Sequence, residues 1–147
     1  MTETRHTLNE LLVDLFNFIL LIEEKNLHDK GVKLSMTEVH ILEAIDKSSS
    51  KMMSAVAKRL MVTQGTLTVS TNKLVKKGYV SRCKDENDKR IVRLQLTEKA
   101  DYVLDVHNSF HADMIDRLLN ELELDKEYEL ISSLRNLMDF FKSNYDL

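Results

Sequence analysis

Hydroxyl and amide side chains between residues 63 and 73 have the chemistry needed to contact the edges of nucleic-acid bases. Such groups hydrogen-bond to base edges or phosphates, and a threonine methyl group can contact the methyl group of thymine. Threonine is a mediocre helix former, so an ordinary polar helix surface explains this composition poorly. The residues expected to contact DNA here are Thr63, Gln64, Gly65, Thr66, Thr68, Ser70, Thr71, Asn72 and Lys73.

Basic residues are concentrated in the same part of the chain. Residues 51–93 contain eleven Lys or Arg and three acidic residues, a balance of +8, whereas the remaining residues sum to −11 and the whole chain to −3. A basic block inside an acidic chain is the electrostatic footprint of a surface that binds a polyanion. On charge alone, a solvated charged face is the alternative interpretation.

A second group of charges lies at the tip of a predicted hairpin. The segments 79–84 and 91–96 alternate apolar and polar residues, which predicts two strands joined by residues 85–90. An arginine at such a tip can enter the narrow minor groove, and Asp88 can pair with it and fix its direction. The expected DNA contacts are Arg82, Lys84, Asp88, Lys89 and Arg90. A solvated charged turn is the alternative.

The elements that position these groups are mainly helical. Proline is absent and glycine occurs three times, which favours long helices with few interruptions. Ser35 and Glu38 have the spacing of a capping box, and we expect Thr63 and Thr97 to be further N-caps. The expected helices cover about 8–28, a segment after Ser35, 53–60, 63–77, a segment after Thr97 and a segment after Asp125. At the starts of two of them lie further expected DNA contacts, Ser35, Thr37 and Ser54.

The first and last helices carry more apolar residues than one packing partner needs. Leu11–Ile22 has ten apolar residues of twelve, but Asp14 and Asn17 interrupt it and it is too short to span a bilayer. In the last helix, apolar residues are spaced 3, 4, 3, 4, which predicts a short seam for a partner helix: Ile131, Leu134, Met138, Phe141 and Tyr145. These helices therefore favour a homodimer.

Two short helices, a tight turn, a longer helix and a charged hairpin predict a winged helix-turn-helix. The expected fold is mainly α with a small β-hairpin wing, in one domain over residues 1–147. The DNA-binding lobe is expected at about 35–97 and the dimerisation helices at about 7–29 and 98–145. Cys83 is the single cysteine, and no signal peptide or membrane span is evident, which favours a cytoplasmic protein.

The chain resembles the MarR family along nearly its whole length. The resemblance lies in the segments 54–60, 62–63, 74–80, 85–90 and 94–99, which include the wing pattern Asp88-x-Arg90 and the run Leu96-Thr97-Glu98-Lys99. It implies a dimer built by the first and last helices that binds palindromic double-stranded DNA. Met52 departs from the family, because a threonine commonly caps the following helix, and its absence should cost about 1 kcal/mol. Met61 stands where many turns of this kind carry glycine.

Within the family, the chain is similar to the FabT-type repressors of bacterial fatty-acid synthesis genes. The similar segments are 22–27, 60–66 and 107–114. This similarity implies a long-chain acyl group on acyl carrier protein as corepressor, with no other cofactor. Flexible apolar side chains suit such a ligand, and the expected pocket residues are Leu15, Phe16, Ile19, Met36, His40, Phe110 and Met114.

Other readings of the sequence stay open beside this one. A MarR-type repressor released from DNA by a small lipophilic or phenolic ligand is one alternative, and a winged-helix module that binds protein is another. His107 and His111 have i, i+4 spacing that suits a metal, with His40 as a third ligand, but we favour structural or pocket-lining roles and expect no metal. Cys83 is read as a half-buried strand residue rather than a redox sensor, and no catalytic arrangement is evident.

Overall fold

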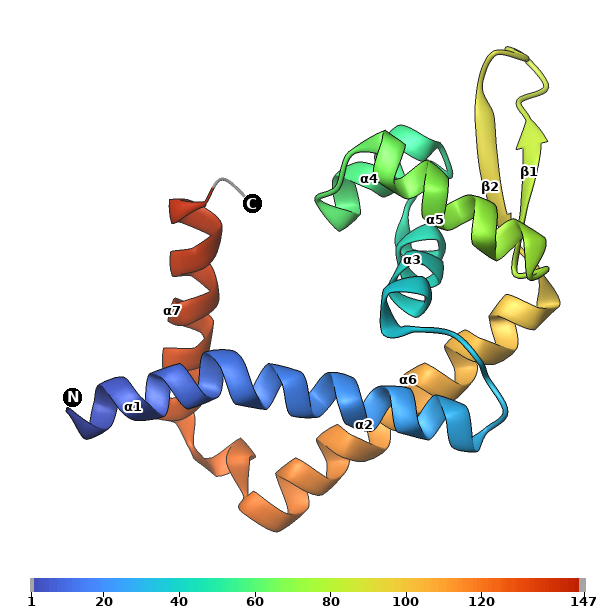
Figure 1. Cartoon of the computed structure of the whole chain (residues 1–147). Coiled ribbons are helices and arrows are strands. Elements are labelled where there is room, and N and C mark those ends of the chain that lie inside the picture. The colour runs from blue at the N-terminus through green and yellow to red at the C-terminus, as the bar shows by residue number, and fades with distance from the viewer. Residues whose placement is uncertain (1, 146–147) are drawn as a thin grey trace. The chain divides into compact units, whose positions relative to one another are not determined.

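The computed structural model describes residues 2–145, which fall into two compact units divided within one long helix. Unit 1 extends to His107 and unit 2 begins at Asn108. Unit 1 contains α1 (Glu3–Glu10), a π-helical stretch (Leu11–Leu15), α2 (Phe16–Asp29), α3 (Met36–Lys47), α4 (Met53–Leu60), α5 (Gln64–Lys76), β1 (Val80–Lys84), β2 (Val92–Leu96) and the start of α6 (Glu98–Leu122). Unit 2 contains the rest of α6, a 3₁₀ turn (Leu124–Lys126) and α7 (Tyr128–Asn144). The mainly helical fold with one hairpin wing agrees with the sequence prediction (Figure 1).

Helix α3 begins at the predicted capping box. The backbone N–H of Glu38 donates to Ser35 Oγ at 3.3 Å, and the Ser35 N–H donates to Glu38 Oε2 at 3.0 Å. The other oxygen of Glu38 accepts from Lys77 Nζ at 2.6 Å, which joins the start of α3 to the end of α5. One carboxylate therefore satisfies a helix end and fixes two helices of the lobe relative to each other.

The turn between α4 and α5 is formed by Met61 in the left-handed region, with φ 56°. The predicted bounds of α4 are confirmed, and Met52 at its N-cap makes no side-chain capping hydrogen bond. Thr63 caps α5 as predicted, because its Oγ1 accepts from the Thr66 N–H at 3.2 Å. The helix-turn-helix therefore has one satisfied N-cap and one that lacks a side-chain partner.

The hairpin is a regular antiparallel pair in which Val80 lies opposite Leu96 and Lys84 opposite Val92. Thr97 follows β2, and its hydroxyl donates to the carbonyl oxygens of Gly78 at 2.8 Å and Tyr79 at 3.2 Å. That side chain therefore ties the base of the hairpin to the end of α5.

The core of unit 1 lies among α3, α4, α5, the hairpin and the start of α6. Its fully buried members include Val39 and Ile45 of α3, Val56 of α4, Leu94 of β2 and Val103 of α6. Burying each such side chain stabilises the fold by about 1.5–3 kcal/mol. The base of the wing and the helix-turn-helix thus share one core.

In unit 2, α7 begins at Tyr128, later than the sequence suggested, because a 3₁₀ turn takes up the preceding residues. Most of its apolar side chains are exposed, among them Met138 at 60% and Phe140 at 54%, whereas Leu137 and Phe141 are half-buried. Among residues 2–145, no helix has both the length and the apolar character that crossing a bilayer requires.

Replacing Glu38 tests the junction of α3 and α5. Burial raises the pKa of Glu38, but the hydrogen bonds from Lys77 and Ser35 and the charge of Lys77 outweigh it and hold the pKa below its ordinary value of 4.5. Glu38→Ala removes a cap and an ion pair and should lower the free energy of unfolding by about 1–2 kcal/mol at pH 7.

Glu38→Gln keeps the capping chemistry and removes the charge, so it should cost about 1 kcal/mol or less. A lowered carboxyl pKa stabilises the fold above pH 4.5, and the gain is lost as the pH falls through the folded-state pKa. Urea unfolding between pH 7 and pH 3 should show the wild type and Glu38→Gln converging in acid. A constant difference across this range would contradict the assignment.

Candidate nucleic-acid interface

Helix α5 buries one stripe of side chains and leaves the rest of its surface open. Leu67, Thr71 and Leu74 are 1%, 0% and 0% exposed, and their spacing of four and three residues places them on one face. The DNA contact predicted for Thr71 is wrong, because a fully buried side chain cannot reach a ligand outside. Thr71 instead belongs to the inward stripe.

The other residues predicted on α5 lie on its accessible surface. Ser70 is half-buried, and the exposed ones are Gln64, Gly65, Thr66, Thr68, Asn72 and Lys73. Two further exposed residues of α5 were not predicted. Val69 is 60% exposed on the side opposite the inward stripe, and Lys76 is exposed on the same side. Their spacing from Leu67 and Leu74 in the sequence could have indicated that both face outward. An exposed valine there can contact a thymine methyl group.

Three hydroxyl groups at the start of α5 already make local hydrogen bonds. Thr68 Oγ1 donates to the carbonyl of Gln64 at 2.7 Å, and the hydroxyls of Thr63 and Thr66 share a hydrogen bond of 3.0 Å. With its proton committed, Thr68 can offer an acceptor lone pair and its methyl group. This favours contact with a base amino group or a thymine methyl over contact with a phosphate.

Gly65 lies in the first turn of α5 with open space around it. A Cβ built there would meet only Thr63 Oγ1, at 3.9 Å, and the backbone is not in the left-handed region. No group of the described chain therefore approaches this position closely enough to require glycine. Exposed N–H groups at a helix start bind phosphate well, and the missing side chain lets a ligand come close to them.

The predicted pairing at the wing tip is confirmed. The guanidinium of Arg90 donates twice to the carboxylate of Asp88, at 3.0 and 2.9 Å, and the Arg90 N–H donates to the same group at 3.0 Å. These hydrogen bonds hold the pKa of Asp88 below its ordinary value and raise the pKa of Arg90. The Arg90 side chain is 91% exposed, so the wing carries an oriented cation into solvent.

A second ion pair at the wing was not predicted. Arg93 of β2 donates from Nε to Asp85 at 2.8 Å, and the other oxygen of Asp85 accepts from the N–H groups of Asn87 and Asp88. The Arg93 and backbone hydrogen bonds hold the pKa of Asp85 below its ordinary value. Asp85 thus fixes the loop on which Asp88 and Arg90 stand.

The hairpin is also tied to α5 directly. Arg82 of β1 donates to Asn72 of α5 at 2.7 Å, which joins two residues predicted to contact DNA. Lys84 and Lys89 of the wing are exposed, as are Ser35, Thr37 and Ser54 at the starts of α3 and α4. The Ser35 hydroxyl already takes part in the capping box, so it has less hydrogen-bonding capacity left for a phosphate.

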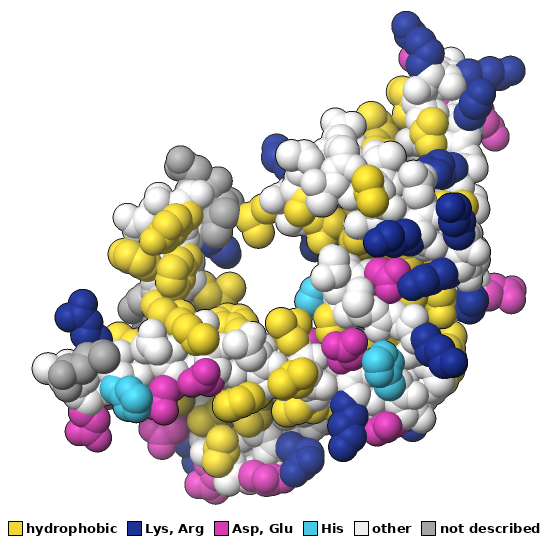
Figure 2. Space-filling view, viewed as in Figure 1, with side chains coloured by type: hydrophobic (Ala, Val, Ile, Leu, Met, Phe, Trp, Pro, Cys, Tyr) yellow, Lys and Arg dark blue, Asp and Glu magenta, His cyan; other side chains and the backbone are white. Residues whose placement is uncertain are grey.

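Part of the basic block is used inside the lobe. Lys51 Nζ donates to the carbonyls of Ile45 and Asp46 at the end of α3, and Lys77 pairs with Glu38. The exposed cations include Lys73, Lys76 and those of the wing, and Figure 2 shows Lys and Arg side chains gathered at the hairpin tip. The wing and the end of α5 therefore carry much of the exposed positive charge of unit 1.

The residues predicted to line an acyl pocket are in different environments. Leu15 and Phe16 are 43% and 61% exposed, Ile19 is half-buried and Met36 is part of the core. His40 borders a cavity of about 190 Å³ between α3 and α5, with Ile41, Leu60, Val62 and Leu67 as its apolar wall. Phe110 and Met114 are half-buried residues of unit 2.

Comparison with known proteins places this architecture among transcription regulators. Residues 34–92 match the model of the MarR family. The regulator SarZ of Staphylococcus aureus is 30% identical over 117 residues, which cover 80% of this chain and 76% of SarZ. The structure of Streptococcus pneumoniae FabT in complex with DNA has a TM-score of 0.85 and 34% identity, over 95% of this chain and 98% of FabT. The regulator BldR of Sulfolobus solfataricus has a TM-score of 0.65 and 26% identity, over 95% and 99%.

Gly65→Ala separates folding from DNA binding. The added Cβ has room in the free protein and alanine is the better helix former, so the free energy of unfolding should rise by about 0.5–1 kcal/mol. If DNA approaches the start of α5, the same variant should bind operator DNA more weakly. Denaturant unfolding and fluorescence anisotropy measure the two effects.

Two variants serve as comparisons for Gly65→Ala. Gly78→Ala should destabilise the fold, because its φ of +81° strains any other residue. Arg90→Ala should leave stability nearly unchanged and weaken binding to all DNA sequences. It should also reduce the slope of log affinity against log salt concentration by the contribution of about one phosphate contact. Unchanged DNA affinity in a stabilised Gly65→Ala protein would contradict the proposed approach.

Proposed function

The chain belongs to the MarR family of DNA-binding transcription regulators, and we propose that it represses fatty-acid synthesis genes with a long-chain acyl group on acyl carrier protein as corepressor. Members of this family are regulators rather than enzymes. The proposal extends this shared role to a particular set of genes and a particular effector.

The observation that carries the DNA-binding part of the proposal is that α5 has an outward polar face and the wing has an oriented Arg90. Helix α5 offers hydroxyl, amide and methyl groups that suit the major groove, and the wing offers an exposed guanidinium that suits the minor groove. The solved complex of a 34% identical FabT with DNA supports this mode of binding.

The apolar side chains left exposed in each unit support a homodimer. In unit 1, Phe16 and Leu21 of α2 are 61% and 65% exposed, and in unit 2 the seam residue Met138 is 60% exposed. Figure 2 shows apolar side chains on the surfaces of both units. In water such surfaces are unfavourable, and a second copy of the chain would bury them. A dimer would present two α5 helices to two half-sites one DNA turn apart.

The acyl effector is supported by the FabT-like segments and by the identity to FabT, and less directly by the cavities. Because Leu15 and Phe16 are exposed in the single chain, they could enclose an acyl chain only when other surfaces cover them. An effector can change DNA affinity only if it binds the DNA-competent state better than the other state. A chain contacting both α2 and α3 would meet that condition by fixing their separation.

Light scattering tests the homodimer. At micromolar concentration the protein should have a mass about twice the 17.1 kDa of one chain. Leu134→Asp places a charge in the exposed seam of α7 and should shift the equilibrium toward the monomer, whereas Arg135→Ala on the same helix should not. A wild-type mass of one chain would exclude the dimer and leave the DNA-binding surface itself untouched.

Operator affinity in the presence of acyl carrier protein tests the effector. Carriers bearing C8, C16 and C18:1 chains are compared with unacylated carrier. Each buried CH₂ contributes about 0.8 kcal/mol, so affinity should rise with chain length until the site is filled. Equal affinity with all four carriers would refute the corepressor. Weaker DNA binding with a long chain would instead support the alternative, a lipophilic ligand that releases the repressor.

A further inference from the structure

We propose that His40, Glu43 and His107 bind one divalent transition-metal ion, such as Zn²⁺, at the packing surface of α3 and the start of α6. None of its three ligands is among the residues predicted to contact DNA, and the site goes beyond the proposed function. It also revises the sequence-based expectation that these histidines have only structural or pocket-lining roles.

The three side chains converge within unit 1. One nitrogen from each histidine and one oxygen of Glu43 all lie within 4.8 Å of one another, and the rings of His40 and His107 are 6.2 Å apart at an angle of 64°. His40 and Glu43 are three residues apart on α3 and so share one helix face. His107 faces them from α6.

This ligand set matches known metal chemistry. Two imidazoles and a carboxylate are typical of Zn²⁺ and other divalent first-row ions, with a water completing the coordination. Ligand atoms around a tetrahedral ion with bonds of about 2.1 Å lie about 3.4 Å apart. Binding an ion would require the three side chains to close the remaining gap.

The site is accessible from solvent on the side of α3. His40 and Glu43 border an open cavity of about 360 Å³, and both are half-buried. His107 is 1% exposed, so it would bind the ion from the buried side, away from this cavity.

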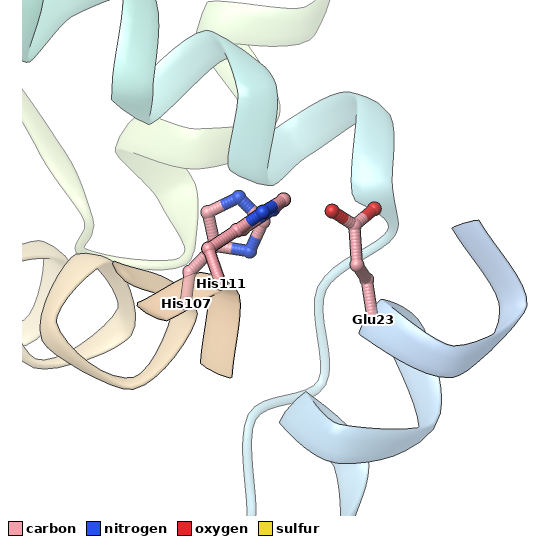
Figure 3. A group of neighbouring side chains, drawn as sticks. All are labelled: Glu23, His107 and His111. Atoms are coloured by element: carbon pink, nitrogen blue, oxygen red, sulfur yellow. The ribbon is translucent and has the colours of Figure 1, made fainter. Parts of the chain in front are cut away.

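Glu23 of α2 supplies a second carboxylate beside His107. It is 3% exposed, and one of its oxygens lies within 4.8 Å of a His107 nitrogen. Figure 3 shows Glu23 directed toward His107, together with His111 one turn further along α6. A carboxylate next to a ligating imidazole commonly orients the ring and raises its basicity. Glu23 is therefore assigned as a positioning residue for His107.

Lys47 provides a directional test of the site. Its Nζ lies 2.5 Å from Glu43 Oε1, so it competes with a metal ion for that oxygen. Removing this ammonium should raise metal affinity, whereas a merely structural His–Glu cluster predicts no effect on metal binding. Lys47→Gln should bind the metal about 2- to 5-fold more tightly, as expected from the loss of one exposed ion pair.

The experiment uses the full-length, tag-free chain after treatment with a chelator. Zn²⁺ is titrated by calorimetry, and Co²⁺ is followed by its visible absorption, which reports the coordination number. We expect one ion per chain, with affinity reduced about 100-fold by His40→Ala and by Glu43→Gln. Glu23→Gln should reduce it about 10- to 100-fold, as for other outer-shell partners.

His28→Ala and His6→Ala are matched controls, because both residues are exposed, i, i+4 from a glutamate and remote from the cluster in sequence. They should leave the affinity and the Co²⁺ spectrum unchanged. His107→Ala can disturb folding because the His107 ring is buried. The test therefore relies on variants of His40 and Glu43, which are partly exposed. The proposal would be overturned if His40→Ala and Glu43→Gln bound the metal as tightly as the wild type. It would also be overturned if the control variants lost binding, or if the wild type bound no stoichiometric metal.

Discussion

The burial of Leu67, Thr71 and Leu74 on one side of α5 is the constraint from which the candidate interface follows. A helix that buries only one stripe leaves its opposite surface to solvent, and here that surface carries Val69 together with polar groups such as Asn72. The inward side chains pack into the core shared with α3 and the hairpin. The orientation of the outward groups is therefore set by packing energy rather than by the groups themselves.

The wing depends on a different force, since much of its tip is exposed and has few apolar contacts. Its conformation is held by carboxylates that accept several hydrogen bonds, Asp85 from Arg93 and two backbone N–H groups, and Asp88 from Arg90. Exposed ion pairs contribute little to stability. Their effect here is to orient a guanidinium before any ligand arrives, which reduces the entropy lost on binding.

Local patterns in the sequence predicted the local structure well. The bounds of α4, the caps at Ser35 and Thr63 and the Asp88–Arg90 pair all depend on residues within a few positions of each other. Errors arose where tertiary packing decides. Thr71 looked like a DNA contact by residue type, yet its spacing from Leu67 and Leu74 places it in the core.

Contacts between polar groups far apart in the chain could not be predicted from their spacing in the sequence. Nothing in the chain indicates that Glu23, which directly follows a long apolar run, is buried near His107 of α6, or that Glu38 meets Lys77. The i, i+4 spacing of His107 and His111 was visible, but the approach of Glu43 from α3 depends on how two helices pack. The acyl pocket stays a prediction for a related reason, because Leu15 and Phe16 are still 43% and 61% exposed in unit 1.

Helix α3 connects these features, because each of its faces meets a different part of unit 1. Its start is joined to the end of α5 through Glu38 and Lys77, its apolar face forms the core, and His40 and Glu43 face His107 of α6. A ligand that changes the position of α3 must therefore change the position of α5 or break the Glu38 junction. By linkage, such a ligand and DNA would each alter the affinity for the other by the same factor. The same helix that supports the recognition surface is thus the element through which an effector could act on it.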